Sequence, residues 1–271
     1  MAIQKFYKPL SLEEAVFQKD KAGGDAYYIA GGTELNSADF KKKISSVISL
    51  EKLGLSEITD NSGEIKIGAG VTIQAIVDSP LIPAPLKKAA KHIVNRNIRE
   101  MATIGGNIAS NKSCSNLLPI LCAFDAELTI LDNSGEKKIS VYQYISDEKN
   151  NLIISINLNK NYFSREYNIL KFSRTSNDIS IITVATEIYR NDGIIKDSRI
   201  FIGGVSKHIV RMVEIEKLIN GKKPMSKAEI EKAVKEIINP ISDIRGSAEF
   251  KKQIGAVLIA DCIYGTTSEE K

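Results

Sequence analysis

Two short segments with paired glycines carry the residue types best suited to holding a phosphate-containing ligand. The first, Ile29–Leu35, reads Ile-Ala-Gly-Gly-Thr-Glu-Leu, and the second, Thr103–Ala109, reads Thr-Ile-Gly-Gly-Asn-Ile-Ala. Adjacent glycines permit positive φ and lack the Cβ atoms that would keep a ligand away from the backbone. Consecutive N–H groups can then turn inward and form a nest for phosphate oxygens. Two such loops in one half of the chain predict a long anionic ligand gripped at two points, and a dinucleotide fits this description.

Small polar side chains accompany both glycine pairs. Thr33 offers a hydroxyl donor, and around the second pair Thr103, Asn107, Ser110 and Asn116 form a polar face in an apolar stretch. Neutral donors and acceptors suit phosphate, ribityl and ribose hydroxyl groups without burying a charge. The candidate cofactor-binding residues are therefore Ile29, Ala30, Gly31, Gly32, Thr33, Glu34, Leu35, Thr103, Ile104, Gly105, Gly106, Asn107, Ser110 and Asn116. The alternative interpretation is that both segments are ordinary tight turns.

Other kinds of active site find little support in the sequence. The only two histidines, His92 and His208, have no second metal ligand at a suitable spacing, and we expect surface or capping roles for them. No G-x-S-x-G or Walker A motif occurs, and Gly68-Ala-Gly70 lacks the third glycine of a dinucleotide fingerprint. We therefore expect no catalytic residue and no metal site in this chain.

The composition is that of a globular protein without an obvious nucleic-acid or membrane surface. The 271 residues carry a net charge of only +4, with lysines and acidic residues interspersed, so no basic stripe predicts nucleic-acid binding. No apolar run approaches the ~20 residues that cross a bilayer, and the first residues do not resemble a secretory leader. Three scattered cysteines fit a reducing cytoplasm and are too few to hold an iron–sulfur cluster.

Local signals predict mixed helices and strands up to about residue 159. Ser11 and Glu14 form a capping-box pattern that opens a helix, and Thr72 is expected to cap another. Further helices are expected over 83–93 and 117–124. Strands are expected over 26–29, 47–50, 65–68 and 127–131, with a turn at 60–63.

The pattern changes after Asn159. Long β-rich runs extend from 167 to 204, and Asn191-Asp-Gly193 supplies a hairpin signal. A second capping box at Ser226 opens a helix to about 238, and a final helix begins after Ser247. We predict an α+β protein with a first domain over 1–159, split near residue 55 into two α+β subdomains, and a second domain over 160–271.

The glycine segments resemble those of a known family, the FAD-binding medium subunits of molybdenum hydroxylases such as xanthine dehydrogenase and carbon monoxide dehydrogenase. Ala30-Gly-Gly-Thr-Glu-Leu35 matches the first flavin motif of that family, and Ile98-Arg-Glu-Met-Ala-Thr-Ile-Gly-Gly-Asn-Ile108 matches the second. Downstream, Ser115-Asn-Leu-Leu-Pro119, Lys171-x-x-Arg174 with Asp178, and Asp243-Ile-Arg-Gly-Ser247 resemble later family signatures. The resemblance covers nearly the whole chain.

The resemblance implies a fold and a set of ligand contacts. The fold would be a two-subdomain FAD-binding region of the vanillyl-alcohol oxidase type, followed by a small domain with a three- or four-stranded antiparallel sheet and helices. The first loop would hold the FAD pyrophosphate, and the second would help to hold the cofactor near the flavin. Asn116 aligns with a nucleotide-binding carboxylate and Lys171 with a lysine near the flavin. Asn116 replaces the usual aspartate, and Ser113 replaces a common proline.

The function implied by the resemblance is electron transfer within a molybdopterin-dependent, xanthine dehydrogenase-like complex. FAD in this subunit would receive electrons from the 2Fe–2S clusters of a small partner subunit. A large molybdopterin subunit would oxidise the substrate, and NAD or another carrier would be the acceptor. Two rival interpretations remain: a self-sufficient flavin oxidoreductase with the same fold, and a scaffold protein that no longer binds flavin.

Overall fold

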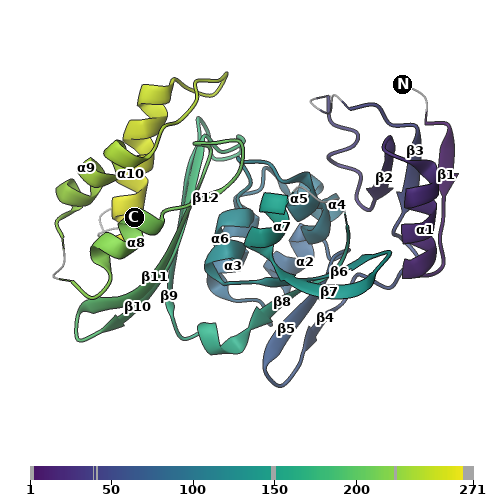
Figure 1. Cartoon of the computed structure of the whole chain (residues 1–271), viewed down its shortest axis with the longest axis horizontal. Helices are drawn as coiled ribbons and strands as arrows, with labels where there is room; N and C mark the ends of the chain where they lie inside the picture. Colours follow the sequence, from purple (N-terminus) through teal and green to yellow (C-terminus); the bar gives the residue numbers. More distant parts are fainter. Residues whose placement is uncertain (1–2, 39, 41, 148–150, 223–224, 265–271) are drawn as a thin grey trace. The chain divides into compact units, whose positions relative to one another are not determined.

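The computed structural model describes residues 3–38, 40, 42–147, 151–222 and 225–264 (Figure 1). The chain forms two compact units whose segments interleave along the sequence. The first unit comprises Met1–Ile82, Asn95–Ser110 and Ala126–Lys160, and the second comprises Pro83–Val94, Asn111–Asp125 and Asn161–Lys271. One boundary falls next to the predicted division at 159/160, but two earlier segments, 83–94 and 111–125, belong to the same compact unit as the C-terminal region.

The first unit contains two sheets. Its elements are β1 (Lys5–Tyr7), α1 (Leu12–Ala22), β2 (Ala26–Ile29), β3 (Ser46–Ser49), β4 (Ile58–Asp60), β5 (Glu64–Gly68), α2 (Ile73–Asp78), α4 (Arg96–Met101), α5 (Ile104–Ser110), β6 (Glu127–Asp132), β7 (Gly135–Ser140), α7 (Val141–Asp147) and β8 (Leu152–Asn159). The parallel three-stranded sheet has the order β1-β3-β2, and the antiparallel five-stranded sheet has the order β4-β5-β8-β6-β7. Buried Val16 and Ile48 share a core with Leu131, Leu152 and Ile154, so apolar burial joins the α1 region to the larger sheet.

The two helix caps predicted in this unit, at Ser11 and Thr72, are confirmed. The Ser11 hydroxyl accepts the N–H of Glu14 at 3.1 Å, and Thr72 caps α2 by accepting the N–H of Ala75 at 3.1 Å. The Glu14 carboxylate accepts the N–H of Leu10 at 2.8 Å instead of that of Ser11. The sequence patterns did not predict β1, β4, β7, β8, α4 or α7, and they placed the second glycine pair in a loop where the structure has α5.

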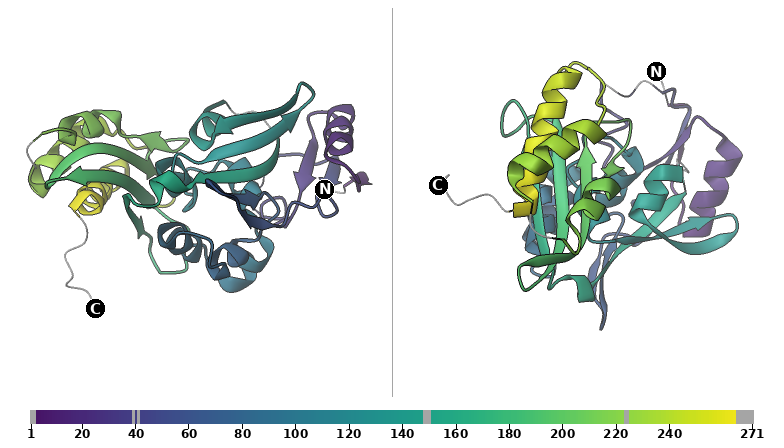
Figure 2. Two further views of the ribbon diagram at one scale, coloured as in Figure 1. Left: turned by 90° about the horizontal axis from the view of Figure 1, so that it is seen from below. Right: turned by 60° about the vertical axis from the view of Figure 1, so that its left-hand side comes forward.

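The second unit is an antiparallel sheet between two layers of helices. Its elements are α3 (Ala84–Lys91), α6 (Leu118–Ala123), β9 (Glu166–Phe172), β10 (Ile182–Asn191), β11 (Ile194–Gly203), β12 (Val210–Arg211), α8 (Val213–Ile219), α9 (Lys227–Ile237) and α10 (Ala248–Tyr264), with a short 3-10 turn Lys160–Tyr162 before β9. The strand order is β12-β11-β10-β9. Helices α8, α9 and α10 lie together on the sheet (Figures 1 and 2).

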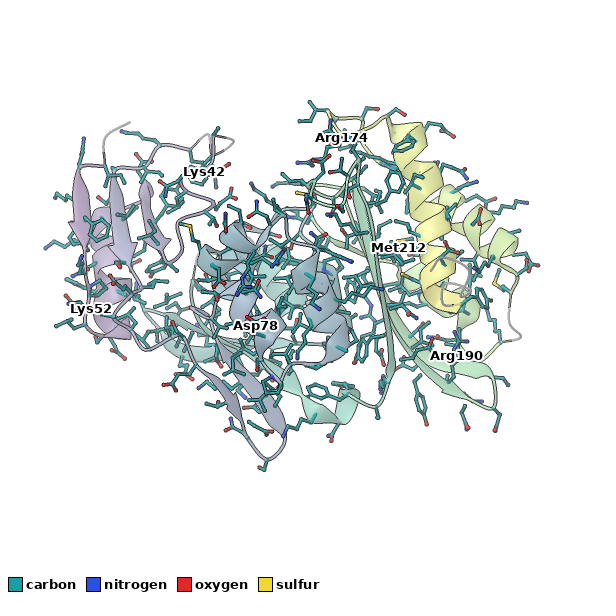
Figure 3. All side chains as sticks on the ribbon, turned by 180° about the vertical axis from the view of Figure 1, so that it is seen from behind. Lys42, Lys52, Asp78, Arg174, Arg190 and Met212 are labelled. Atoms are coloured by element: carbon teal, nitrogen blue, oxygen red, sulfur yellow. The ribbon has the colours of Figure 1, made fainter. Side chains whose placement is uncertain are left out.

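Burial on both faces explains the composition of β10. Val184 and Ile188 pack in the core formed with α10, while Thr183 and Glu187, which alternate with them, point to the other face and are equally buried. The hairpin predicted at Asn191-Asp-Gly193 is confirmed, with positive φ at Asp192 (50°) and Gly193 (73°). Arg174, on the loop between β9 and β10, lies near the start of α10 (Figure 3), where the rings of Phe172 and Phe250 are 5.7 Å apart.

Candidate functional site

The first glycine segment leaves β2 and turns at once against the backbone of another segment. An ideal Cβ atom on Gly31 would lie 1.6 Å from the carbonyl oxygen of Met101, so only glycine fits there. Gly32 has φ of +69°, a conformation that favours glycine. A turn follows, in which the N–H of Asn36 donates to the carbonyl of Gly32 at 3.0 Å. The last residue of β2, Ile29, accepts the N–H of Leu50 at 2.9 Å and fixes where the loop begins.

Three successive main-chain N–H groups in this loop make no hydrogen bond within the part of the chain that the structure describes. Within the described ranges, the N–H groups of Gly31, Gly32 and Thr33 and the Thr33 hydroxyl make no hydrogen bond to the chain. Ala30 is exposed, and the residues from Gly31 to Leu35 are half-buried. Consecutive unused N–H groups beside residues without large side chains fit an anionic phosphate group. The first segment therefore meets the chemical requirement for a pyrophosphate cradle.

The second glycine segment is different, because it is the first turn of helix α5. The N–H of Ile104 donates to the carbonyl of Val71 at 3.0 Å, and that of Gly105 donates to Ala69 at 2.9 Å. An ideal Cβ atom on Gly105 would lie 2.7 Å from Ala69, so this glycine permits a close approach of two backbones. The prediction of a second nest of inward-turned N–H groups is wrong, since neighbouring segments already accept these donors.

The polar side chains of α5 also take part in the helix itself. The Thr103 hydroxyl accepts the N–H of Gly106 at 3.1 Å, and the N–H of Asn107 donates to the carbonyl of Thr103 at 2.9 Å. The Ser110 hydroxyl donates to the carbonyl of Asn107 at 2.7 Å. Gly106 is exposed and Thr103 is buried. If this segment takes part in binding a ligand, the contacts would come from its side chains and from the exposed surface at Gly106.

The two glycine segments meet in the first unit. Gly31 packs on the carbonyl of Met101 and on the N–H of Ala102, the residue directly before Thr103. The isolated bridge between Thr72 and Thr103 and the hydrogen bond from Ile73 N–H to the Ala102 carbonyl at 2.8 Å hold this stretch in place. Segments about 70 residues apart in the chain are thus brought into direct contact.

Asn116 belongs to the second unit, where its amide is used within the protein. Its Nδ2 donates to the carbonyl of His92 at 3.1 Å, and its Oδ1 accepts the hydroxyls of Thr183 at 3.1 Å and of Ser180. Asn116 is only 7% exposed, and Ser180 and Thr183 are also buried. The side chain ties the segment before α6 to the end of α3 and to the start of β10.

Lys171, on β9, makes a similar tie in the same unit. Its Nζ donates to the carbonyls of Asp178 at 2.7 Å, Ser176 at 3.0 Å and His92 at 3.2 Å. Burial lowers the pKa of Lys171, and the nearby Asp178 carboxylate opposes that shift. Arg174 pairs with Asp178 at 3.4 Å. Lys171 therefore anchors the loop after β9, and its role toward a cofactor stays a prediction.

His92 connects the two predicted cofactor-binding residues Asn116 and Lys171. It is the C-cap residue of α3, which agrees with the capping role considered from the sequence. Its carbonyl accepts hydrogen bonds from both Asn116 and Lys171. Burial, then the charges of Lys171 and Lys88, lower the pKa of His92 to about 4. Its buried Nδ1 has no hydrogen-bond partner among the described residues. The sequence predicted a helix over 83–93 and a surface or capping role for His92, but it did not predict the two donors to the His92 carbonyl.

The described part of the chain contains neither a metal-binding cluster nor a helix suited to crossing a membrane. It holds no group of three or more His, Cys, Asp or Glu side chains placed to bind a metal ion. None of its helices has the length and apolar character needed to cross a bilayer.

Comparison with known proteins assigns the fold and the family. The family model described as the FAD binding domain in molybdopterin dehydrogenase matches residues 2–158, and the model described as the CO dehydrogenase flavoprotein C-terminal domain matches residues 166–265. Carbon monoxide dehydrogenase from Hydrogenophaga pseudoflava has a chain of the same fold, with a TM-score of 0.89, 22% identity, and coverage of 97% of this chain and 96% of that one. The predicted order of an FAD-binding region followed by a small flavoprotein domain of antiparallel sheet and helices is confirmed.

Two sequence relatives span almost the whole chain. The uncharacterized protein YgfM of Escherichia coli (strain K12) is 32% identical over 259 residues, covering 96% of this chain and 95% of YgfM. The nicotine 6-hydroxylase medium subunit of Paenarthrobacter nicotinovorans is 27% identical over 271 residues, covering 94% of each chain. The predicted cofactor, FAD, is confirmed by the family. This chain belongs to the FAD-binding medium subunits of the molybdenum hydroxylases.

Proposed function

We propose that this chain is the electron-transfer subunit of a molybdopterin-dependent hydroxylase or dehydrogenase of the xanthine dehydrogenase type. In this proposal it receives electrons from the 2Fe–2S clusters of a small partner subunit and delivers them to NAD or another acceptor. A large molybdopterin-binding subunit would oxidise the substrate, and the complex would work in the cytoplasm. FAD, when bound, supplies the redox chemistry, and the protein supplies position and environment.

The observation that carries the proposal is the set of main-chain donors at Gly31, Gly32 and Thr33 that have no acceptor among the described residues and lie beside the second family motif. These N–H groups would hold the FAD pyrophosphate. Thr33 would add its hydroxyl, and Ile29, Ala30, Glu34 and Leu35 would shape the loop. Thr103, Asn107 and Ser110 would contribute side chains next to Gly105 and Gly106. Asn116 and Lys171 remain proposed contacts, supported by the resemblance of the sequence around them to the family's motifs.

The first experiment measures the FAD content of the purified chain. Gly32→Val puts a branched side chain into the proposed cradle and forces a β-branched residue into positive φ. Gly54→Val is the matched control, because Gly54 has nearly the same φ (+67° against +69°) and an added Cβ there would meet nothing within 4 Å. We expect the wild type and Gly54→Val to carry FAD and Gly32→Val to lose it. Stoichiometric FAD in Gly32→Val would contradict the assignment of the first loop.

The second experiment tests the electron-transfer role. The complex is purified from native cells through a tag on this chain, and the accompanying chains are identified. Molybdopterin and 2Fe–2S subunits in stable proportion, together with reduction of the bound FAD by substrate only in the complex, are expected. Substrate turnover by the isolated chain would instead favour a self-sufficient flavin oxidoreductase.

A further inference from the structure

A cavity lies in the first unit, apart from both glycine segments. It has a volume of about 440 Å³ and opens between helix α1, strand β2, the β6–β7 turn and the start of β8. None of its lining residues belongs to Ile29–Leu35 or to Thr103–Asn116. The volume falls within the range of about 300–1,000 Å³ that is typical of small-molecule sites.

Three apolar side chains contribute to the lining of this cavity. Val16, Leu131 and Leu152 line it and are 7%, 9% and 1% exposed, respectively. All three belong to the core that joins the α1 region to the larger sheet, so they stand on regular elements and not on loops. A flat apolar group placed against them would remove apolar surface from water and would gain free energy roughly in proportion to the buried area.

Two hydrogen-bond donors on the cavity wall have no acceptor. Within the described residues, Nζ of Lys19 makes no hydrogen bond and no ion pair within 4 Å, and the hydroxyl of Tyr28 makes no hydrogen bond. Burial lowers the pKa of Lys19, while the neighbouring Asp20 raises it. Burial is also the main cause of a raised pKa at Tyr28, so its hydroxyl keeps its proton and stays a donor. An ammonium group and a phenol with no partner are complementary to an anionic oxygen.

The two carboxylates on the rim accept hydrogen bonds from the chain itself. Asp132 accepts Nζ of Lys137 at 3.0 Å and the N–H of Ser134 at 2.8 Å. Asp20 accepts the side-chain amide of Asn133, a contact that spans from α1 to the β6–β7 turn across the cavity rim. Within the described residues, Lys19 and Tyr28 are donors of this cavity that have no partner, and they line it together with Val16, Leu131 and Leu152.

We propose that this cavity binds a small organic carboxylate with an apolar body. The carboxylate would accept hydrogen bonds from Lys19 and Tyr28, and the body would lie on Val16, Leu131 and Leu152. The site would be independent of FAD, because it shares no residue with the glycine segments. It would give the subunit a second small-molecule contact beyond its proposed electron-transfer role.

The experiment uses benzoate as the probe and benzamide as its neutral analogue. Binding to the full-length chain is measured by ligand-observed nuclear magnetic resonance at several concentrations. We expect saturable binding of benzoate with a Kd of about 1 mM, and binding of benzamide at least about tenfold weaker. Lys19→Met should weaken benzoate binding about tenfold, and Tyr28→Phe should weaken it several-fold.

Lys21→Met is the matched control on the same helix. Lys21 is exposed, lies over the ring of Phe17 and does not line the cavity, so its variant should bind benzoate as the wild type does. Equal binding of benzoate and benzamide, undiminished binding in Lys19→Met, or no saturable binding at all would overturn the proposal. FAD content is recorded for each variant, so a failure of this site is distinguishable from a failure of the FAD cradle.

Discussion

Gly31 lies directly against the carbonyl of Met101, so that an added Cβ atom would stand 1.6 Å from that oxygen. The contact joins the loop after β2 to the end of α4, two residues before Thr103. Both flavin motifs of the family are therefore parts of one packed structure in the first unit. The glycine at position 31 is required by this backbone contact, whereas the glycine at 32 is favoured by its positive φ.

The contact predicts a large effect of Gly31→Ala on stability. The neighbour is backbone and cannot move aside cheaply, so we expect a loss of about 3 kcal/mol in the free energy of unfolding. Chemical denaturation of the purified chain measures this. Gly24→Ala is the control, because an added Cβ there would meet nothing within 4 Å and its φ is not positive. Equal stability of the two variants would refute the close approach.

Substitutions at Thr103 distinguish a structural role of its hydroxyl from a ligand-binding role. Thr103→Val keeps the shape but removes the acceptor of the Gly106 N–H, and the expected cost is about 1 kcal/mol. Thr103→Ser keeps the hydroxyl and should restore most of that stability. Thermal unfolding and FAD content are measured on both variants. A stable Thr103→Val variant that has lost FAD would show that the hydroxyl serves the cofactor more than the helix.

Asn116→Ala should destabilise the second unit by about 2–4 kcal/mol. It leaves the buried hydroxyls of Ser180 and Thr183 without their acceptor and removes the donor to the His92 carbonyl. Ser180→Ala removes only one member of the network and should cost about 1 kcal/mol. Denaturant titration of both variants tests this order, and an Asn116→Ala variant as stable as the wild type would rule out the network.

His92 predicts an acid-sensitive contribution to stability. Its pKa falls from the ordinary 6.5 to about 4 in the folded chain, so the unfolded chain binds a proton that the folded chain refuses. The contribution is full above pH 6.5 and is lost as the pH falls toward 4. Because the side chain is partly exposed, we expect about 1 kcal/mol. His92→Gln should flatten the curve of unfolding free energy against pH in this window. A His92→Gln curve as steep as that of the wild type would disprove the assignment.

Features encoded by neighbouring residues could be predicted from the sequence. The capping box at Ser226 forms both of its bonds, and Asp192 and Gly193 turn the β10–β11 hairpin. The two flavin motifs and the later signatures led to the family that the comparisons confirm. Each of these depends on a few consecutive residues, so the order of residues alone contains the necessary information.

The tertiary structure decided which donors remain for a ligand. Both glycine pairs look alike in sequence, yet the N–H groups of Ile104 and Gly105 donate to Val71 and Ala69, while those of Gly31 and Gly32 have no partner within the described chain. Likewise, the His92 carbonyl that accepts from Asn116 and Lys171, and the Thr183 hydroxyl that donates to Asn116, come from segments far away in the sequence. A hydrogen-bond partner is fixed by the packing of distant segments, and no local pattern specifies that packing.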